Sequence, residues 1–421
     1  MKQCKVTVFV KELSIRIRRV KGRNLHVTTT IFFGLSVAFF VMVLGCFINN
    51  RARKFLSSNN EFYFPQLATF YTMSPSPSCS SSSAHSLRDW IAPMELSHSM
   101  SDEELAWRAS MVPHMVNYPY NRTPKVAFMF LTRGRLPLAL LWEKFFKGHA
   151  GFYSIYIHTS LELNNEPPES SVFYKRRIPS KAVSQKKIMR SRLSRTGGLC
   201  SLYLCEPAEW GRATMMDAER RLLANALLDF SNERFVLLSE TCIPLFNFTT
   251  IYNYLINSNQ SFVGSFDDPR KMGRGRYNKR MWPTISLSDW RKGNQWFEVR
   301  RRLAVEIVSD VKYYHIFVNH CKPPCYMDEH YLATLVTKTH PDMNSNRSIT
   351  WVDWSRGGSH PTRFVGKDVS ETFLNRVRHG FNCSYNNGNT TTICFLFARK
   401  FEANTLEPLL RIAPTLLGFN P

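Results

Sequence analysis

Acidic residues are scarce in this 421-residue sequence, where 32 Asp and Glu stand against 55 Lys and Arg and give a formal net charge of +23. Such an excess often indicates a nucleic-acid-binding protein. Here it is concentrated at the N-terminus, because residues 1–54 contain eleven Lys and Arg and a single acid, Glu12. Beyond residue 54 no helix-like stretch combines a basic face with interleaved aromatic residues. The charge pattern therefore argues against nucleic acid as a partner.

The Cys-x-x-Cys motif is also missing, although the sequence has ten cysteines. Because that motif is typical of structural zinc sites, its absence disfavours zinc binding. Cysteines that are close in sequence instead suggest disulfide bonds, which persist in oxidising compartments, although spacing alone does not determine the pairing. The close pairs are Cys200/Cys205, Cys321/Cys325 and Cys383/Cys394.

A run without any charged residue extends from Val27 to Ile48, over 22 residues. As a helix rising about 1.5 Å per residue, it would cross the roughly 30 Å hydrocarbon core of a membrane. The apolar region of a cleaved signal peptide is usually shorter, at about 7–15 residues. Eight Lys and Arg precede the run and three follow it closely, so the positive-inside rule keeps the N-terminus in the cytosol. We predict a cytoplasmic tail at 1–26 and a single-pass signal-anchor at 27–48, with the remainder outside the cytosol.

This orientation also accounts for the Asn-x-Ser/Thr sequons, which are glycosylated only in a secretory compartment. The six sequons begin at Asn121, Asn247, Asn259, Asn346, Asn382 and Asn389. We assign residues 49–123 to a luminal stem, because they include the low-complexity run Ser74–Ser83. Within it, Ser101 and Glu104 have the spacing of a capping box and predict a short helix. We expect a folded domain at 124–421.

In the folded domain, short apolar runs alternate with amphipathic segments, which predicts an α/β sheet protein. Residues 297–311 fit either a helix or a strand followed by a helix. Ligands of such sheets bind beyond the carboxyl ends of the strands, so Thr132 and Arg133, Thr159 and Ser160, and Ser239 and Glu240 are candidate site residues. The expected strands are 125–131, 152–159, 201–204, 234–239 and 261–266, and the expected helices are 137–146, 213–230 and 250–256.

One further segment, Pro323–Val336, places an acid at the start of an expected helix, where its position is fixed. Asp328 is expected to cap a short helix, and Glu329 then lies in its first turn. A carboxylate fixed on a regular element can act as a general base. Acids are nevertheless common in first turns, because the helix dipole favours them there. From these residues alone, an ordinary first-turn acid is the simpler interpretation.

Several blocks together resemble the core-2/I-branching β-1,6-N-acetylglucosaminyltransferases, glycosyltransferase family 14, and especially their plant branch. The resemblance extends over roughly residues 124–402, and no single block carries it alone. The blocks are Val126–Thr132, Phe235–Pro244, Gly293–Trp296, Tyr326–Glu329 and Leu396–Phe401.

The resemblance implies a type II Golgi membrane protein with a GT-A-like, Rossmann-like nucleotide-binding fold. It also implies inverting transfer of a sugar, N-acetylglucosamine in the family, from a UDP donor to a glycan or glycoprotein acceptor. By this resemblance Glu329 is the catalytic base, Lys400 and Arg363 contact the donor diphosphate, and Trp351 lies on the acceptor side. The family's acceptor-binding basic block aligns loosely with Arg276–Arg280. The donor would then also meet Thr132 and Arg133.

The sequence contains no Asp-x-Asp motif, with which many GT-A enzymes hold a divalent metal at the donor diphosphate. A lysine and an arginine can stabilise the departing diphosphate as fixed cations instead, so we expect neither a metal nor another cofactor. One departure is Thr159, where animal members carry an aspartate. His158, His330 and the tryptophans 282, 290, 296 and 354 are expected to be structural. A degenerate luminal glycan-binding module is the alternative, and glucuronic acid, galactose and xylose remain open as donor sugars.

Overall fold

The structure is a computed structural model, and it describes residues 91, 96–113, 117–159, 166–178, 213–358, 360–386 and 388–419. By its internal contacts the chain divides after Ser82, and every described residue belongs to the second unit. The predicted tail, signal-anchor and most of the stem lie outside the described residues, as do the expected strand 201–204, Ser160 and the pair Cys200/Cys205. Among the residues that are described, no helix is both long enough and apolar enough to cross a membrane.

The central sheet has four strands in the order β2-β1-β3-β5. The first three are parallel, and β5 runs antiparallel to β3. Leu131 pairs with both His158 and Ser239, so the three parallel strands end side by side. This arrangement confirms the mixed α/β fold. The strands are β1 (Lys125–Leu131), β2 (Tyr153–His158), β3 (Asn232–Ser239) and β5 (Glu298–Arg300).

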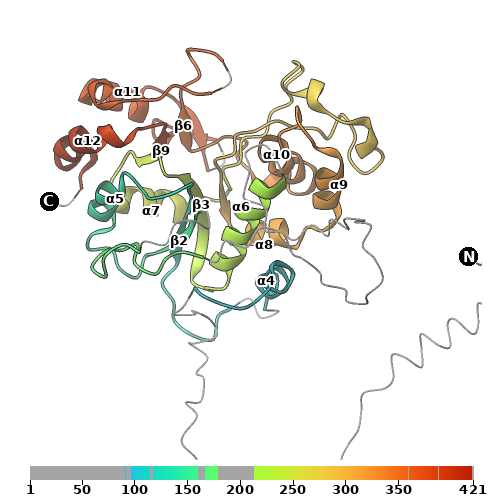
Figure 1. Cartoon of the computed structure of the whole chain (residues 1–421), viewed down its shortest axis with the longest axis horizontal. Helices are drawn as coiled ribbons and strands as arrows, with labels where there is room; N and C mark the ends of the chain where they lie inside the picture. The colour runs from blue at the N-terminus through green and yellow to red at the C-terminus, as the bar shows by residue number, and fades with distance from the viewer. Residues whose placement is uncertain are drawn as a thin grey trace, which may run out of the picture. The chain divides into compact units, whose positions relative to one another are not determined.

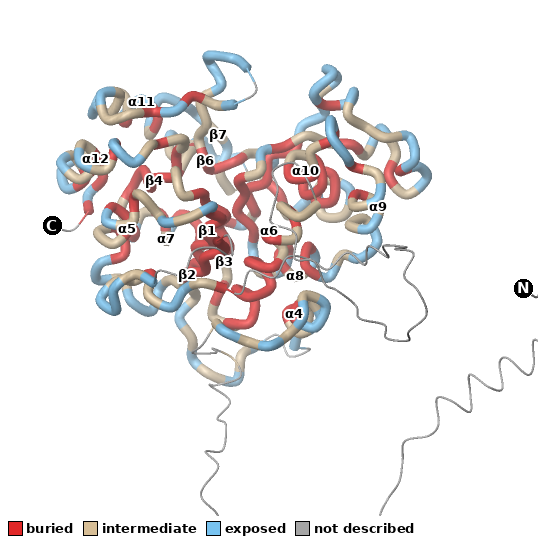
Figure 2. Tube along the Cα trace, viewed as in Figure 1, coloured by how far each residue is buried: buried red, intermediate tan, exposed pale blue. Residues whose placement is uncertain are grey.

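Helices cover both faces of this sheet, as Figure 1 shows. Alternate residues of β1 point to opposite faces: Ala127 and Met129 pack with α6 and α8, whereas Phe128 and Phe130 pack with α5 and α7. Burial on both sides explains why β1 is a continuous apolar run, and Figure 2 shows β1 and β3 buried along most of their length. The covering helices are α5 (Ala139–Phe146), α6 (Ala213–Leu227), α7 (Phe248–Ile256) and α8 (Arg301–Ser309).

Beyond the carboxyl end of β3 lies a second, three-stranded sheet with the order β4-β9-β6. It brings the last part of the chain to the edge of the central sheet, because Phe401 N–H donates to the Thr241 carbonyl at 3.0 Å. The β7–β8 hairpin is closed by the disulfide Cys383–Cys394. The elements are β4 (Ile243–Pro244), β6 (Thr350–Val352), β9 (Phe397–Arg399), β7 (Cys383–Tyr385), β8 (Asn389–Thr391), α11 (Glu371–His379) and α12 (Leu406–Ile412).

Two more helices, α9 (Lys312–His320) and α10 (Met327–Thr339), are joined by a turn that the disulfide Cys321–Cys325 closes. Both described disulfides join cysteines that are close in sequence. Short helical turns complete the fold. They are the 3₁₀ helices η1 (Arg274–Arg276), η2 (Lys279–Met281), η3 (Pro341–Met343), η4 (Gly366–Asp368) and η5 (Ala403–Thr405), and the π-helix η6 (Ala413–Leu417).

The expected capping box is present, since Ser101 and Glu104 exchange hydrogen bonds at the start of α4 (Asp102–Ala109). This helix does not project as part of a stem. Leu105 and Ala109 enter the hydrophobic core beside α6, and Asp102 forms an ion pair with Arg221. The folded region therefore includes a helix that the sequence pattern assigned to the stem.

One expectation about strands needs correction. Residues 261–266 form no regular strand, because their backbone pairs in turn with three separate positions, Asn344, Glu298 and Lys292. Residues 297–311 are a strand followed by a helix, β5 and α8, one of the two alternatives left open above.

Candidate active site

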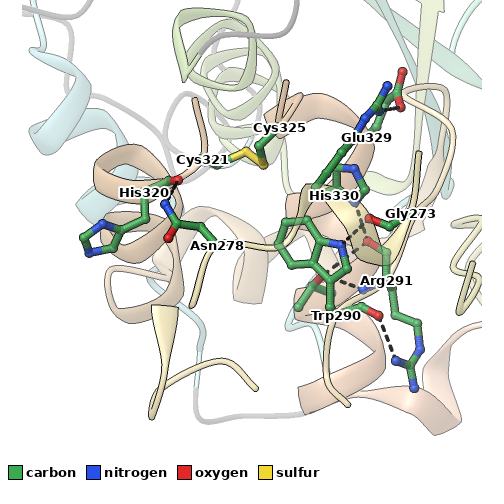
Figure 3. The surroundings of a disulfide bond; sticks show 11 residues. Gly273, Asn278, Trp290, Arg291, His320, Cys321, Cys325, Glu329 and His330 are labelled. Atoms are coloured by element: carbon green, nitrogen blue, oxygen red, sulfur yellow. Dashed lines mark hydrogen bonds and ion pairs between the residues drawn. A yellow bond between two sulfur atoms is a disulfide. The ribbon is translucent and has the colours of Figure 1, made fainter. Parts of the chain in front are cut away.

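Glu329 is the third residue of α10 and so lies in the first turn, as predicted. The helix begins directly after the disulfide-closed turn, and Figure 3 shows Glu329 and His330 beside this turn. Tyr326 precedes the helix and gives no side-chain cap. The prediction that Asp328 caps α10 is wrong, because Asp328 is already inside the helix and its carboxylate is buried.

The Glu329 carboxylate contacts two cations through one oxygen. Its Oε2 accepts a hydrogen bond from Arg276 Nη1 at 2.6 Å and another from Lys292 Nζ at 2.8 Å. Burial by itself would raise the pKa of Glu329, but the hydrogen bond and charge of Lys292, together with the charge of Arg276, outweigh it and hold this pKa below its ordinary value. Glu329 is therefore ionised at neutral pH.

The segment that supplies both cations is fixed against α10. Trp290 stacks on His330, with ring centroids 4.4 Å apart, and donates from Nε1 to the Gly273 carbonyl at 3.1 Å (Figure 3). Gly293 N–H donates to the Glu329 carbonyl at 2.7 Å. A Cβ at Gly293 would come within 2.0 Å of a backbone oxygen, so only glycine allows this approach.

Behind Glu329, two carboxyl groups are buried together. Burial, and then the nearby charge of Glu329, raise the pKa of Asp328 to about 7, and neither Asp328 oxygen has a hydrogen-bond partner in the described part of the chain. Glu219 on α6 interacts electrostatically with Asp328, and burial raises its pKa well above the ordinary value. Gln295 donates to Glu219 at 2.8 Å. Burial therefore favours the protonated, uncharged form of Glu219 behind Glu329.

A second charged region gathers around Lys400, which follows β9. Phe364 N–H donates to the Lys400 carbonyl at 2.8 Å, and this backbone contact brings Arg363 beside Lys400. Lys400 is half-buried. Burial, and next the charges of Arg399 and Arg363, lower its pKa, and Arg133 acts in the same direction. Three of the donor residues predicted from sequence therefore lie in one cationic region.

Arg399 belongs to this region but was not predicted. It is half-buried, its guanidinium lies 4.2 Å from the centre of the Trp296 ring, and its buried Nε has no hydrogen-bond partner among the described residues. Glu240, at the carboxyl end of β3, is the acid whose charge acts on both Arg399 and Lys400. The sequence signal that could have identified Arg399 was its position beside Lys400 in the Leu396–Phe401 block.

Other expected site residues have structural contacts. The Thr132 hydroxyl exchanges hydrogen bonds with the backbone of Gly134 and shapes the turn after β1. Trp351 is half-buried on β6 and stacks on Phe364 at 5.8 Å. His158, which was expected to be structural, is buried at the end of β2 and contacts Arg221 at 3.3 Å. Burial lowers the pKa of His158 to about 4, so it is neutral at physiological pH.

The tryptophans divide into two groups. Trp290 and Trp296 are buried, as expected, whereas Trp282 and Trp354 have exposed fractions of 70% and 48%. Trp296 also links the two charged regions, because it packs on Arg399 and lies three residues after Gly293, which contacts Glu329. In the described ranges, no group of three His, Cys, Asp or Glu side chains is arranged to hold a metal ion.

Comparison with known proteins places the sequence in a family. The family model described as Core-2/I-Branching enzyme matches residues 126–196 and 203–378, more than half of the chain. The chain belongs to the Core-2/I-branching enzyme family. Within this family match lie Arg276, Lys292, Glu329 and Arg363, whereas Lys400 follows its last matched residue.

A relative of this Core-2/I-branching chain is a rice protein (Oryza sativa subsp. japonica) named glycosyltransferase BC10. The two are 32% identical over 320 residues, which cover 66% of this chain and 73% of the relative. The family match and this relative confirm the resemblance drawn from the sequence blocks, and they support a glycosyltransferase.

Proposed function

We propose that the protein is an inverting, metal-independent glycosyltransferase with a GT-A-like domain. It transfers a sugar, N-acetylglucosamine by family resemblance, from a UDP donor to a glycan or glycoprotein acceptor. The observation that carries the proposal is the pairing of an ionised carboxylate, Glu329, with a separate excess of cations around Lys400. These are the two chemical requirements of the reaction.

Inversion needs one base. As the acceptor hydroxyl attacks the anomeric carbon, the hydroxyl proton passes to Glu329. A new glycosidic C–O bond forms on the face of the anomeric carbon opposite the departing UDP. The bond between the anomeric carbon and the phosphate oxygen breaks at the same time, and its electron pair leaves with UDP. Glu329 can accept the proton because its lowered pKa keeps it ionised.

The departing UDP carries the negative charge that develops in this step. Lys400, Arg363 and Arg399 supply fixed positive charge at the edge of the sheet, beside the carboxyl end of β3. Preorganised cations in a partly buried site stabilise such charge without reorganisation during the reaction. The position also agrees with the general site of α/β sheets, since the strand order reverses between β1 and β3.

We further propose that the protein is a type II Golgi membrane protein anchored by residues 27–48, with its catalytic domain in the lumen. The uncharged run, the charge asymmetry around it and the sequons support this placement. Protease protection of the full-length protein in sealed Golgi vesicles tests the topology. Digestion of the domain by protease added outside intact vesicles would contradict it.

The activity is tested by donor binding and transfer in the presence of EDTA. We expect UDP and one UDP-sugar to raise the melting temperature of the full-length protein in detergent. Ligand at about 100 times its Kd stabilises a protein by roughly 2.7 kcal/mol. The same UDP-sugar should then support transfer to a glycan acceptor without added metal. A folded sample that binds glycans but neither UDP nor any UDP-sugar would favour the degenerate binding module.

A further inference from the structure

We propose that Lys292 is a positioning residue for the base: together with Arg276 it holds one oxygen of Glu329 and leaves the other directed to the acceptor hydroxyl. This inference rests on the proposed function, because it assigns Lys292 a role in the transfer step. The resemblance to the family supplied no role for Lys292.

The first support is the asymmetry of the carboxylate. Both cations contact Oε2, at 2.6 Å and 2.8 Å. Oε1 makes no hydrogen bond with any residue that the structure describes, and it is not among the fully buried polar atoms without a partner. One oxygen is therefore held in place by both cations, and the other keeps some accessible surface in a side chain that is 19% exposed. A general base needs this geometry, because its accepting oxygen must reach the acceptor hydroxyl within hydrogen-bond distance.

The second support is the rigidity of Lys292 itself. Its backbone forms two hydrogen bonds with Phe266, of 2.7 Å and 2.9 Å, and the next residue, Gly293, donates to the Glu329 carbonyl. Lys292 and Glu329 are thus tied through their backbones as well as their side chains. A long side chain usually loses conformational entropy when it forms an ion pair. Here the backbones of both partners are already fixed, so only side-chain entropy is lost when the pair forms.

Arg276 is held on the other side. Its guanidinium lies 4.5 Å from the centre of the Tyr326 ring and contacts Glu329. Arg276 falls in the block that aligns loosely with the family's acceptor-binding residues, so acceptor binding can engage it. Lys292 then remains as the contact that keeps the carboxylate oriented and ionised.

The other titratable groups around Glu329 do not replace Lys292. Burial lowers the pKa of His330 to about 4, so it is uncharged at neutral pH, and its Nδ1 lies 2.8 Å from the Arg291 carbonyl. Asp328 and Glu219 are acids and offer no positive charge. Among the described residues, the cationic contacts of the Glu329 carboxylate are therefore those with Lys292 and Arg276.

The test compares Lys292→Met, which keeps the apolar stem, with Lys292→Arg, which keeps the charge. A matched control is Lys338→Met on α10, the helix that carries Glu329, since Lys338 pairs with Asp289 at 2.8 Å and its side chain is 26% exposed, against 21% for Lys292. We expect Lys292→Met to lower kcat by roughly ten- to a hundredfold, the effect of a misplaced catalytic group. The donor KM should stay within about twofold, since the donor diphosphate is bound elsewhere. Lys292→Arg should restore most of the loss, and Lys338→Met should change neither value.

The pH profile separates positioning from a merely structural role. Loss of the Lys292 charge raises the pKa of Glu329, so the acidic limb of kcat/KM should move to higher pH in Lys292→Met. It should return toward the wild-type position in Lys292→Arg and stay in place in Lys338→Met. Stabilisation by UDP reports that each variant is folded. If Lys292→Met does not fold, Lys292→Gln gives the same comparison with a neutral donor of similar length.

A wild-type kcat and an unmoved acidic limb in a folded Lys292→Met or Lys292→Gln would overturn the inference. Glu329→Gln keeps this result distinct from failure of the proposed function. If Glu329→Gln is inactive while the Lys292 variants behave as wild type, only the role of Lys292 is wrong. If Glu329→Gln retains transfer, the assignment of the base fails first.

Discussion

The two charged regions of this protein differ in how their charge is balanced. Around Glu329, one carboxylate is shared by Arg276 and Lys292, and all three side chains are mostly buried. Around Lys400, the neighbouring charges are Arg399, Arg363 and Arg133 against two acids, Glu240 and Glu402, and Glu402 pairs with Arg363 at 3.4 Å. The first region is largely satisfied within the protein. The second keeps an excess of positive charge in a half-buried position.

This difference indicates that the Lys400 region, rather than the Glu329 region, is suited to bind an anion. Crowded cations in a partly desolvated site are unfavourable by themselves, as the lowered pKa of Lys400 reflects, its largest cause being burial. A diphosphate would remove that cost and form charge-assisted hydrogen bonds. At Glu329 the two cations are already paired with a carboxylate, and the same forces keep it ionised, as the proposed role of a base requires.

The largest expected effect comes from removing the carboxylate. Glu329→Gln should reduce transfer by about 10²- to 10⁴-fold, the usual contribution of a general base, while the affinity for UDP stays close to the wild-type value. Steady-state transfer and calorimetric titration with UDP measure the two quantities. Near wild-type turnover in the variant would show that another group takes the proton.

Substitution of Lys400 should affect only the region around Lys400, and so only the binding of UDP. Lys400→Met should weaken UDP binding by roughly ten- to a hundredfold, because a hydrogen bond to a charged group contributes about 1.5–3 kcal/mol. The exposed Lys367 provides the control, since Lys367→Met should leave binding unchanged. Equal losses of UDP affinity in both variants would mean that binding depends only on the net charge of the protein.

Removing the acid Glu240 should change the affinity for UDP in the opposite direction. Glu240→Gln increases the excess of positive charge beside Lys400 and should tighten UDP binding by about two- to fivefold, in line with the modest value of exposed charge pairs. The effect should shrink as the salt concentration rises, because salt screens such charges. Weaker binding would show that Glu240 contacts the donor itself.

The smallest effects concern stability without ligand, where the two regions should respond in opposite directions. Glu329→Gln should lower the melting temperature, since it leaves Arg276 and Lys292 without their acid, whereas Lys400→Met should raise it slightly. Because the pKa of Glu329 is lowered on folding, its stabilising contribution is present above its ordinary pKa and is lost as the pH falls through the folded value.

The melting temperatures of wild type and Glu329→Gln should therefore converge on acidification. Differential scanning calorimetry from neutral to acidic pH measures this. If the difference in melting temperature stayed constant across this pH range, the charge of Glu329 would not be its cause.

Much of the fold was predictable because it depends on local pattern. The apolar runs of β1 and β3 are buried on both faces, and burial of that kind leaves a continuous signature in the sequence. The capping box of α4 and the place of Glu329 in a first turn follow from spacing over three or four residues. Residues 261–266 were predicted wrongly, because their apolar pattern fits a strand but their backbone partners lie in three distant segments.

The site required the tertiary structure, because its contacts join distant parts of the chain. Lys292 and Arg276 reach Glu329 across 37 and 53 residues, and no local periodicity relates them. Asp328 has the sequence of a cap, yet packing against α6 buries it. The sequence by itself determined the elements, the family blocks and the candidate base, since these depend on neighbouring residues. Which charges are paired and which are left in excess was decided by the fold, because electrostatic energy depends on distance in space and on burial.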